Sequence, residues 1–370
     1  MMNVYNEKRL LLITRIIKGK NHIFDKVYAQ YIAFQNIGLK VDLIYIDEKF
    51  NIILNNAEIG SVFSRIGIHL LFFLKIKRII NTAKYDFIYI RNPFLLNQIS
   101  YYRFLKIAKK NNVELILEIP TYPYEKEIKG FFSKILLLLE KIFQSKLKNH
   151  ISLILYSGNS FNNIYGIKCI QLLNIANPNL IPLSKVKSFP NKLKLIGVSS
   201  CHDYNGFDRV IEGLHHYKHS DVMVEFHIIG NGPEFNRYLN LVNNYHLNDK
   251  VILHGKVYGD NLNILFNEMD IGVSCLGMHR IGLVSGSPLK SAEYALRGIP
   301  FLLAYNDPFF SDQSFCLSIP PNETPVEIND IIHWFSTNEF KHQDIRELTM
   351  KNVSWEQQFN SIITSLIKLN

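Results

Sequence analysis

Short β-branched runs alternate with longer amphipathic stretches along this chain, and this alternation limits its fold more than any other feature. In the first half, helical patterns at residues 26–35, 101–110 and 131–148 separate the apolar runs. Strands that alternate with helices form a parallel sheet whose two faces are covered. The strands expected in this half are residues 10–14, 41–46, 87–90, 115–119, 153–156 and 168–172.

The alternation is interrupted once and then starts again. Residues 177–192 contain Pro178, Pro182 and Pro190 without a clear period, which predicts a linker. Expected strands and helices follow it, at residues 193–198, 207–217, 224–229, 234–245, 251–253, 271–274, 289–297 and 301–304. With 370 residues, the chain is longer than one compact domain usually is.

We therefore predict an α/β protein built from two Rossmann-like parallel-sheet domains that face a central cleft, where ligands collect. The N-terminal domain is expected to cover residues 1–185 and the C-terminal domain residues 186–353. Residues 354–370 have the pattern of one amphipathic helix.

Composition favours a globular protein of a reducing compartment. Hydrophobic residues make up 47% of the chain and charged residues 20%, unlike a disordered protein. The four cysteines are far apart, which argues against a disulfide framework or a structural zinc site. No apolar run has the form of a secretion signal or the length of a membrane span. These features predict a cytoplasmic protein.

Charge is distributed unevenly between the two halves. Residues 1–185 carry 26 Lys and Arg against 12 Asp and Glu, whereas residues 186–370 carry 15 against 20. A basic half indicates an anionic partner, such as a membrane surface, a phosphate-bearing acceptor or nucleic acid, although a basic excess also serves solubility. Apolar and basic residues mix in segments 65–78 and 129–148, which could lie on the inner face of a membrane.

Residues 277–300 carry the most chemical information. A glycine-bearing loop leads to Ser287 and Pro288, a good N-cap and first helical residue, and Gly298 suits the left-handed end of the helix. A helix N-terminus attracts anions, and Lys290 adds a full positive charge there. Glu293 follows three residues later on about the same face. The pair suits a phosphate and a sugar hydroxyl, although an ordinary capped helix with an exposed ion pair has the same pattern.

Glu293 followed by Gly298-Ile299-Pro300 resembles the nucleotide-sugar site of retaining GT-B glycosyltransferases of the group 1 (family 4) type. Their signature is a glutamate, seven residues, a second glutamate and a helix that ends in Gly-x-Pro. The resemblance implies that Glu293 binds the ribose of the nucleotide. The first glutamate falls on Ser285, so the contact to the transferred sugar departs from the family pattern.

The resemblance extends over residues 193–305. Where the family has a lysine before Gly-Phe, this chain has Asn205, which leaves Arg209, Arg280 and Lys290 as the cations for a diphosphate. The turn with Gly230 and Gly232 has a simpler interpretation as a tight strand-to-helix connection. With Glu293 and Lys290 as the central pair, the donor-binding candidates are Asn205, Arg209, Gly230, Gly232, Lys256, Arg280, Gly286, Ser287, Pro288 and Leu289.

The first half offers acceptor-side candidates. Gly19 follows the first strand, where the family has a glycine-rich loop. Glu118, Tyr122 and Tyr124 lie at the end of a strand, in a segment that resembles bacterial polysaccharide-building members of the family; a rigid proline loop with packed tyrosines is the alternative. Trp355 and Phe359 resemble the family's final helix, which packs back on the first domain.

The resemblance implies a hexosyltransferase that moves a sugar from a UDP- or GDP-linked donor to a hydroxyl of a glycan or lipid-linked acceptor. The transfer would serve cell-surface glycan assembly and retain the anomeric configuration. No Asp-x-Asp pair occurs in the chain, so we expect no metal ion and no cofactor. The alternatives are a nucleotide-sugar epimerase, a GT-B-like protein that binds a nucleotide or a partner without catalysis, and a basic nucleic-acid-binding protein.

Overall fold

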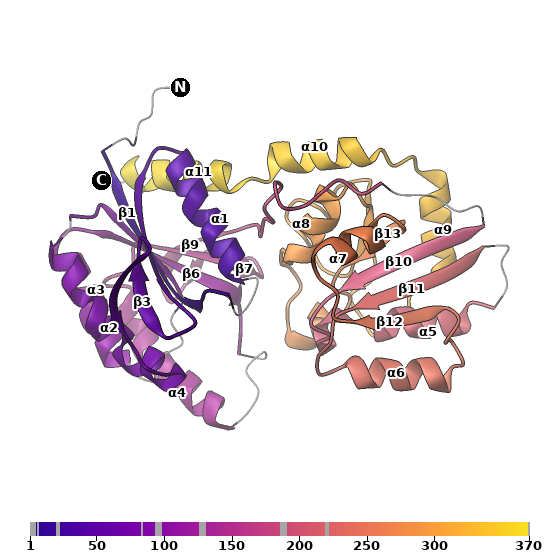
Figure 1. Ribbon diagram of the computed structural model, residues 1–370, viewed down its shortest axis with the longest axis horizontal. Coiled ribbons are helices and arrows are strands. Elements are labelled where there is room, and N and C mark those ends of the chain that lie inside the picture. Colours follow the sequence, from indigo (N-terminus) through magenta and orange to yellow (C-terminus); the bar gives the residue numbers. More distant parts are fainter. Residues whose placement is uncertain are drawn as a thin grey trace. The chain divides into compact units, whose positions relative to one another are not determined.

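The computed structural model describes residues 5, 7–19, 23–82, 84–92, 98–125, 131–185, 191–218 and 222–368. The chain divides into two compact units (Figure 1). Unit 1 contains residues 1–172 and 354–370, and unit 2 contains residues 173–353.

Unit 1 is built on a nine-stranded sheet with the order β4-β3-β2-β1-β5-β6-β7-β9-β8. The six neighbouring strands β2, β1, β5, β6, β7 and β9 are parallel to one another. Antiparallel pairs with β3 and β8 extend the two edges. The strands are β1 (Arg9–Ile17), β2 (Lys40–Ile46), β3 (Asn51–Leu54), β4 (Ala57–Ser61), β5 (Phe87–Arg91), β6 (Glu114–Tyr122), β7 (Leu153–Gly158), β8 (Asn163–Ile164) and β9 (Ile167–Gln171).

Helices cover both faces of this sheet (Figure 1). α1 (Ile23–Asn36) and α11 (Trp355–Lys368) lie together on one face, where the rings of Phe34 and Phe359 stack with centroids 3.9 Å apart. α2 (Arg65–Thr82), α3 (Gln98–Lys110) and α4 (Phe131–Leu147) pack on the other face and bury one continuous apolar core with the strands. The last helix of the chain thus belongs to unit 1.

Unit 2 has a six-stranded, fully parallel sheet with the order β12-β11-β10-β13-β14-β15. This is the Rossmann order, in which the chain reverses direction across the sheet between its first and fourth strands. The strands are β10 (Lys192–Val198), β11 (Met223–Ile229), β12 (Val251–Gly255), β13 (Ile271–Val273), β14 (Phe301–Leu303) and β15 (Cys316–Ser318).

Two separate apolar cores flank this sheet. One core packs α5 (Asp208–His216), α6 (Phe235–Asn244) and α9 (Ile328–Thr337) on one face. The other packs α7 (Gly259–Phe266), α8 (Leu289–Leu296) and α10 (His342–Asn352) on the opposite face. Two short 3-10 turns, η1 (Asp203–Asn205) and η2 (Met278–Ile281), lie at the carboxyl ends of β10 and β13.

The division between the units falls at residue 173, earlier than the boundary at 185/186 expected from the prolines. Residues 173–185 lie with unit 2 because their polar groups bond to it. Asn174 donates to both oxygens of Ser287, and the backbone N–H of Ser184 donates to the carbonyl of Arg297.

Candidate functional site

The reversal of strand order in unit 2 locates the most promising site. Loops after β10 and β13 run in opposite directions there, and ligands of such sheets bind outside the carboxyl ends of these strands. Tyr294 of α8 ties the two ends together, because its buried hydroxyl donates to the carbonyl of Val273 and accepts from the N–H of Val198, at 3.1 Å each. This places α8 against the reversal point.

The start of α8 differs from the expected cap. Pro288 has extended backbone angles and is itself the N-cap, and the helix begins at Leu289. Ser287 instead accepts a hydrogen bond on its Oγ from the N–H of Asn174, at 3.1 Å, so it fixes the loop rather than the helix end. Gly298 has φ +75° just after the helix, which confirms the expected left-handed termination.

Lys290 lies in the first turn of α8 and points into the protein. Its Nζ is buried and has no hydrogen-bond partner among the described residues. It lies 5.1 Å from the centroid of the Phe207 ring. Burial raises the pKa of the nearby Cys201 thiol, and the charge of Lys290 acts in the opposite direction. A buried ammonium without an anionic partner is costly, so this environment suits a bound anion.

Glu293 is held one turn further along the helix. Its Oε1 accepts from Nε and Nη2 of Arg297, at 3.1 and 2.9 Å, while Oε2 has no partner among the described residues. Arg297 is buried, lies over the Phe266 ring and also donates to Asn263. Arg297 therefore fixes the rotamer of Glu293 and leaves one carboxylate oxygen to accept a hydroxyl.

Two of the three expected cations form hydrogen bonds with groups of the protein itself. Arg209 is buried and donates to the carbonyls of Thr324, Leu276 and Pro320. Arg280 directs all five of its N–H groups to protein oxygens, chiefly the carboxylates of Asp208 and Glu323. Both arginines bind together the loops beside the site, and of the three cations only Lys290 has a buried charge without such partners.

Asn205 also has a structural place. It is buried, and its Oδ1 accepts from the N–H of His202 at 2.8 Å, which closes the η1 turn. Gly206 follows with φ +66°, and a Cβ there would lie 2.6 Å from the N of Gly277. The turn is thus packed directly against the loop that leads into α8.

The expected glycines permit close backbone packing. A Cβ on Gly230 or Gly232 would lie 1.7 or 1.9 Å from the carbonyl oxygens of Ser199 and Ser200, so the turn after β11 rests on the loop after β10. The N–H of Gly286 donates to the carbonyl of Asn306, beside the bridge formed by Ser285. Leu289 and Lys256 are exposed, Lys256 just beyond the end of β12.

Glu118, an acceptor-side candidate, lies at the centre of a buried polar cluster in unit 1. Its carboxylate is 1% exposed and accepts from Arg91 at 2.6 Å, from Lys26 at 3.1 Å, and from Tyr89 and Gln30. Burial alone would raise the pKa of Glu118, but the charges of Arg91 and Lys26 outweigh it and lower the pKa to about 2. Burial lowers the pKa of Lys26 to about 8. Glu118 is therefore an internal ion-pair partner.

Gly19 lies two residues after the end of β1, at the carboxyl edge of the unit 1 sheet, with φ +85°. A Cβ at this position would lie 2.1 Å from Oε1 of Glu48. In unit 1 the reversal of strand order falls between β1 and β5, so Gly19 lies where ligands of such a sheet bind.

Tyr122 and Tyr124 belong to an aromatic cluster at the end of β6. Tyr122 is half-buried against Phe161 and Tyr165. The hydroxyl of Tyr124 lies 3.0 Å from that of Tyr165, and Gln144 donates to both. These contacts agree with packed tyrosines in a rigid loop, the simpler of the two interpretations.

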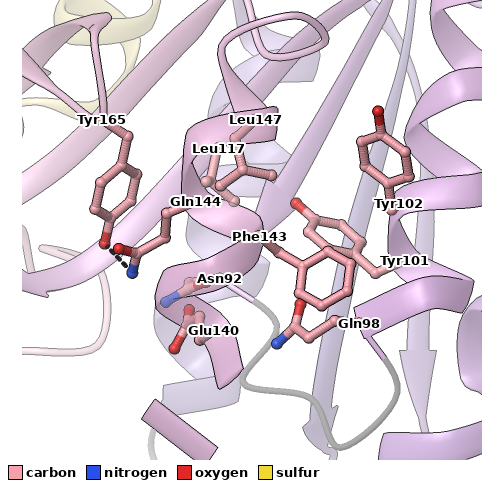
Figure 2. Close-up of a pocket in the computed structure, with 10 residues that line it drawn as sticks. All are labelled: Asn92, Gln98, Tyr101, Tyr102, Leu117, Glu140, Phe143, Gln144, Leu147 and Tyr165. Atoms are coloured by element: carbon pink, nitrogen blue, oxygen red, sulfur yellow. Dashed lines mark hydrogen bonds between the residues drawn. The ribbon is translucent and has the colours of Figure 1, made fainter. Parts of the chain in front are cut away.

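A small pocket adjoins this cluster, and Figure 2 shows Tyr101, Glu140 and Gln144 among its lining side chains. Its volume of about 20 Å³ holds one or two water molecules. Burial raises the pKa of Glu140 to about 7, although the hydrogen bond from Tyr124 opposes this. Glu140 Oε2 and the Tyr101 hydroxyl have no hydrogen-bond partner among the described residues.

Sequence reasoning missed several residues that shape these sites. Arg297 could have been found, because Glu293 and Arg297 are four residues apart on one helix. Phe207 follows Asn205 in the Gly-Phe motif, but nothing local in the sequence connects its ring to Lys290. Lys26 and Arg91 come from separate segments of the chain, and no local pattern connects them to Glu118.

Comparison with solved structures defines the class of the fold. A glycosyltransferase from Rickettsia africae ESF-5 matches with a TM-score of 0.66 and 14% identity, covering 99% of this chain and 100% of that one. The lipopolysaccharide outer core galactosyltransferase WaaB matches at 0.60 and 12% identity, covering 96% and 99%. Anabaena Alr3699/HepE, in complex with UDP and glucose, matches at 0.57 and 12% identity, again covering 96% and 99%. The two Rossmann-like units thus form the GT-B fold.

A part of unit 2 matches a known family by sequence. Residues 183–313 match the family described as glycosyl transferases group 1. This confirms the resemblance to group 1 GT-B glycosyltransferases that the motifs around Glu293 indicated. A search of curated protein sequences found no significant match.

Within the described part of the chain, no helix combines the length and apolarity needed to cross a bilayer. The same residues contain no group of three or more His, Cys, Asp or Glu side chains positioned to hold a metal ion.

Proposed function

We propose that this protein transfers a sugar from a nucleotide diphosphate donor, UDP- or GDP-linked, to a hydroxyl acceptor in cell-surface glycan assembly, with retention of configuration. The buried, unpartnered ammonium of Lys290 is the observation that carries the proposal. It lies in the first turn of a helix at the strand reversal point of a group 1 domain, where it can neutralise a diphosphate. The crystal structure of Anabaena Alr3699/HepE with UDP-glucose supports this choice of donor class.

In this proposal, different residues of unit 2 bind different parts of the donor. Lys290 neutralises the phosphates, and the open Oε2 of Glu293 accepts the ribose hydroxyls. We assign Lys256, which is exposed beyond β12, to the side of the nucleobase. In this proposal no protein nucleophile is needed, because the leaving phosphate accepts the acceptor's proton on the same face of the sugar. The protein supplies orientation and positive charge, and transfer needs no divalent metal.

One experiment tests the activity as a whole. Purified protein is incubated with UDP- and GDP-sugars and a panel of glycan acceptors, with excess EDTA or with Mn²⁺, and products are read by mass spectrometry and anomeric NMR. Transfer that persists in EDTA and keeps the anomeric configuration supports the proposal. Inverted product, or activity restored only by metal, contradicts the mechanism.

A non-catalytic GT-B protein is the second candidate. Ser285 stands in place of the first glutamate of the signature. This position therefore has a buried serine beside Asn306 and lacks the carboxylate of the family pattern. This protein would bind the nucleotide through Lys290 without turnover. Calorimetric binding of UDP or GDP, together with no transfer across the acceptor panel, would favour this candidate.

We further propose that unit 1 attaches to an anionic membrane surface through α4. Ile135, Leu138, Leu139 and Ile142 lie on one side of this helix and are 41%, 66%, 43% and 58% exposed. Lys134 and Lys141, also exposed, flank them. An apolar face bordered by lysines suits a helix that lies in the plane of the interface. Lys129 and Gly130, which belong to the same basic segment, lie outside the described residues.

A further inference from the structure

Unit 1 contains a second pocket, larger than the one beside Glu140, and the sheet topology explains why it forms. The β3–β4 hairpin adds two antiparallel strands beyond β2, so the sheet continues past the strands on which α1 packs. A groove of about 420 Å³ remains between α1 and this extension, within the range of ligand sites. We call it the aromatic groove; Lys18, Phe24, Tyr28, Tyr31, Tyr45 and Asn56 are among its lining residues.

Four aromatic rings form a continuous wall of the aromatic groove. Phe24 packs edge-on against Tyr45, with centroids 5.2 Å apart, and lies parallel to Tyr28 at 6.4 Å. Tyr28 in turn lies 5.7 Å from Tyr31. Phe24 and Tyr45 are buried, whereas Tyr28 is 49% exposed, so its ring faces solvent over a firmly packed base. Such rings offer an electron-rich face to the C–H groups of a ligand.

The polar groups of the aromatic groove suit hydroxyls. The Tyr45 hydroxyl donates to Oδ1 of Asn56 at 3.3 Å, which leaves Nδ2 of Asn56 to donate to a ligand. Asn56 is held in place by the hairpin turn, where Asn55 and Asn56 have φ values of +48° and +73°. Amide and phenol groups beside aromatic faces can recognise polyhydroxylated rings.

The net charge of the groove lining differs from that of the proposed nucleotide site. Lys18 and Asp25 both line it, so the lining is balanced. The Lys18 ammonium lies 5.5 Å from the Tyr45 centroid and 5.9 Å from that of Phe24, where the rings already attract it. A neutral ligand fits this lining better than a phosphate.

We propose that the aromatic groove binds a neutral saccharide unit of the acceptor glycan. It begins beside Lys18 and Gly19, directly after β1, and so extends the edge of unit 1 at which ligands of this sheet bind. The inference rests on the proposed function, because only a transferase with a glycan acceptor needs a second saccharide subsite.

Saturation-transfer NMR on the full chain tests this inference. The probes are maltotriose, the β-1,4-linked trimer of N-acetylglucosamine, and a β-1,4-linked galactose trimer, each with UDP at saturation. We expect at least one trimer to bind, and Tyr28→Ala to weaken that binding about tenfold because the stacking face is lost. Tyr28→Phe keeps the ring and should bind like the wild type. Tyr28 is exposed enough for both variants to fold.

Each outcome has a separate meaning. If no trimer binds, or if Tyr28→Ala binds as well as the wild type, the aromatic groove is not a saccharide subsite. Inorganic phosphate or UMP competing with the trimer would indicate an anion site and also overturn the inference. UDP affinity, measured on the same variants, should be unchanged. Its dependence on Lys290 tests the proposed function independently of the groove.

Discussion

The ammonium of Lys290 lies 5.1 Å from the centre of the Phe207 ring, buried and without a hydrogen-bond partner among the described residues. The ring provides some attraction for the charge, but it does not replace the water that burial removes. An anion would complete the environment of this lysine. The neighbouring cations Arg209 and Arg280 have protein partners instead, and this contrast separates the binding residues of unit 2 from those that support them.

Arg280 should matter for stability and not for nucleotide affinity. Arg280→Ala removes one of the two arginines that donate to the buried Asp208, so the free energy of unfolding should fall by about 1–3 kcal/mol. Urea denaturation measures this loss. Calorimetry on the folded variant should give the wild-type affinity for UDP, and a large loss of affinity would show that Arg280 contacts the diphosphate after all.

Glu293 should bind the ribose. In Glu293→Gln, a charge-assisted bond to a hydroxyl becomes a neutral one, so UDP binding should weaken by about 1.5 kcal/mol or more. The variant should bind 2′,3′-dideoxy-UDP as well as the wild type does, since that ligand lacks the hydroxyls. Equal losses for both ligands would place Glu293 elsewhere. Arg297→Met, which releases the Oε1 contacts, should show a weaker form of the same pattern.

Glu118 should make the stability of unit 1 depend on pH. Its pKa is lowered to about 2, below the ordinary value of 4.5, so its stabilisation is present above about pH 4.5 and is lost as the pH falls toward 2. At pH 7, Glu118→Gln should lower the free energy of unfolding by about 3–5 kcal/mol, because Lys26 and Arg91 lose their carboxylate.

The difference between wild type and Glu118→Gln should shrink as the pH is lowered from 4.5. Chemical denaturation at several pH values measures it, with Glu58→Gln on exposed β4 as the control. A difference that stays constant with pH would contradict the ion-pair account.

The α4 surface should attach to liposomes that contain anionic lipid. Lys134→Gln with Lys141→Gln should weaken co-sedimentation about thirtyfold, since each basic residue contributes about 1 kcal/mol near such a surface. Leu138→Ser with Ile142→Ser should also weaken it. Lys40→Gln with Lys49→Gln, on exposed positions outside α4, should have a small effect. Equal binding to neutral and anionic vesicles would rule out this role for the charge.

Most parallel strands of both units could be predicted from the sequence because each contains a short run rich in apolar residues. β10 and β11, for example, begin one residue before the expected strands 193–198 and 224–229 and end with them. The parallel edge strand β15 was missed because it has only three residues. The β3–β4 hairpin was missed because β3 has only four residues and β4 is largely exposed, so β4 has no apolar run.

In the candidate site, only residues that are close together in the sequence could be predicted to act together. Lys290 and Glu293 lie on one helix, Gly298 follows directly after its end, and the three were found together. The roles of Arg209 and Asn205 depend on groups far along the chain: Arg209 bonds to Thr324, 115 residues away, and Asn205 packs against Cys275. Glu118 follows the same rule, since its partner Lys26 is 92 residues away.

Calorimetric titration of UDP and uridine into the wild type and Lys290→Met, in EDTA, tests the central claim most directly. Lys341→Met, at an exposed lysine of unit 2, is the matched control. We predict that Lys290→Met weakens UDP binding by about 1.5–3 kcal/mol, roughly tenfold or more, and leaves uridine binding and the control unchanged. If Lys290→Met binds UDP as tightly as the wild type, Lys290 does not hold the diphosphate and the proposed donor site is wrong.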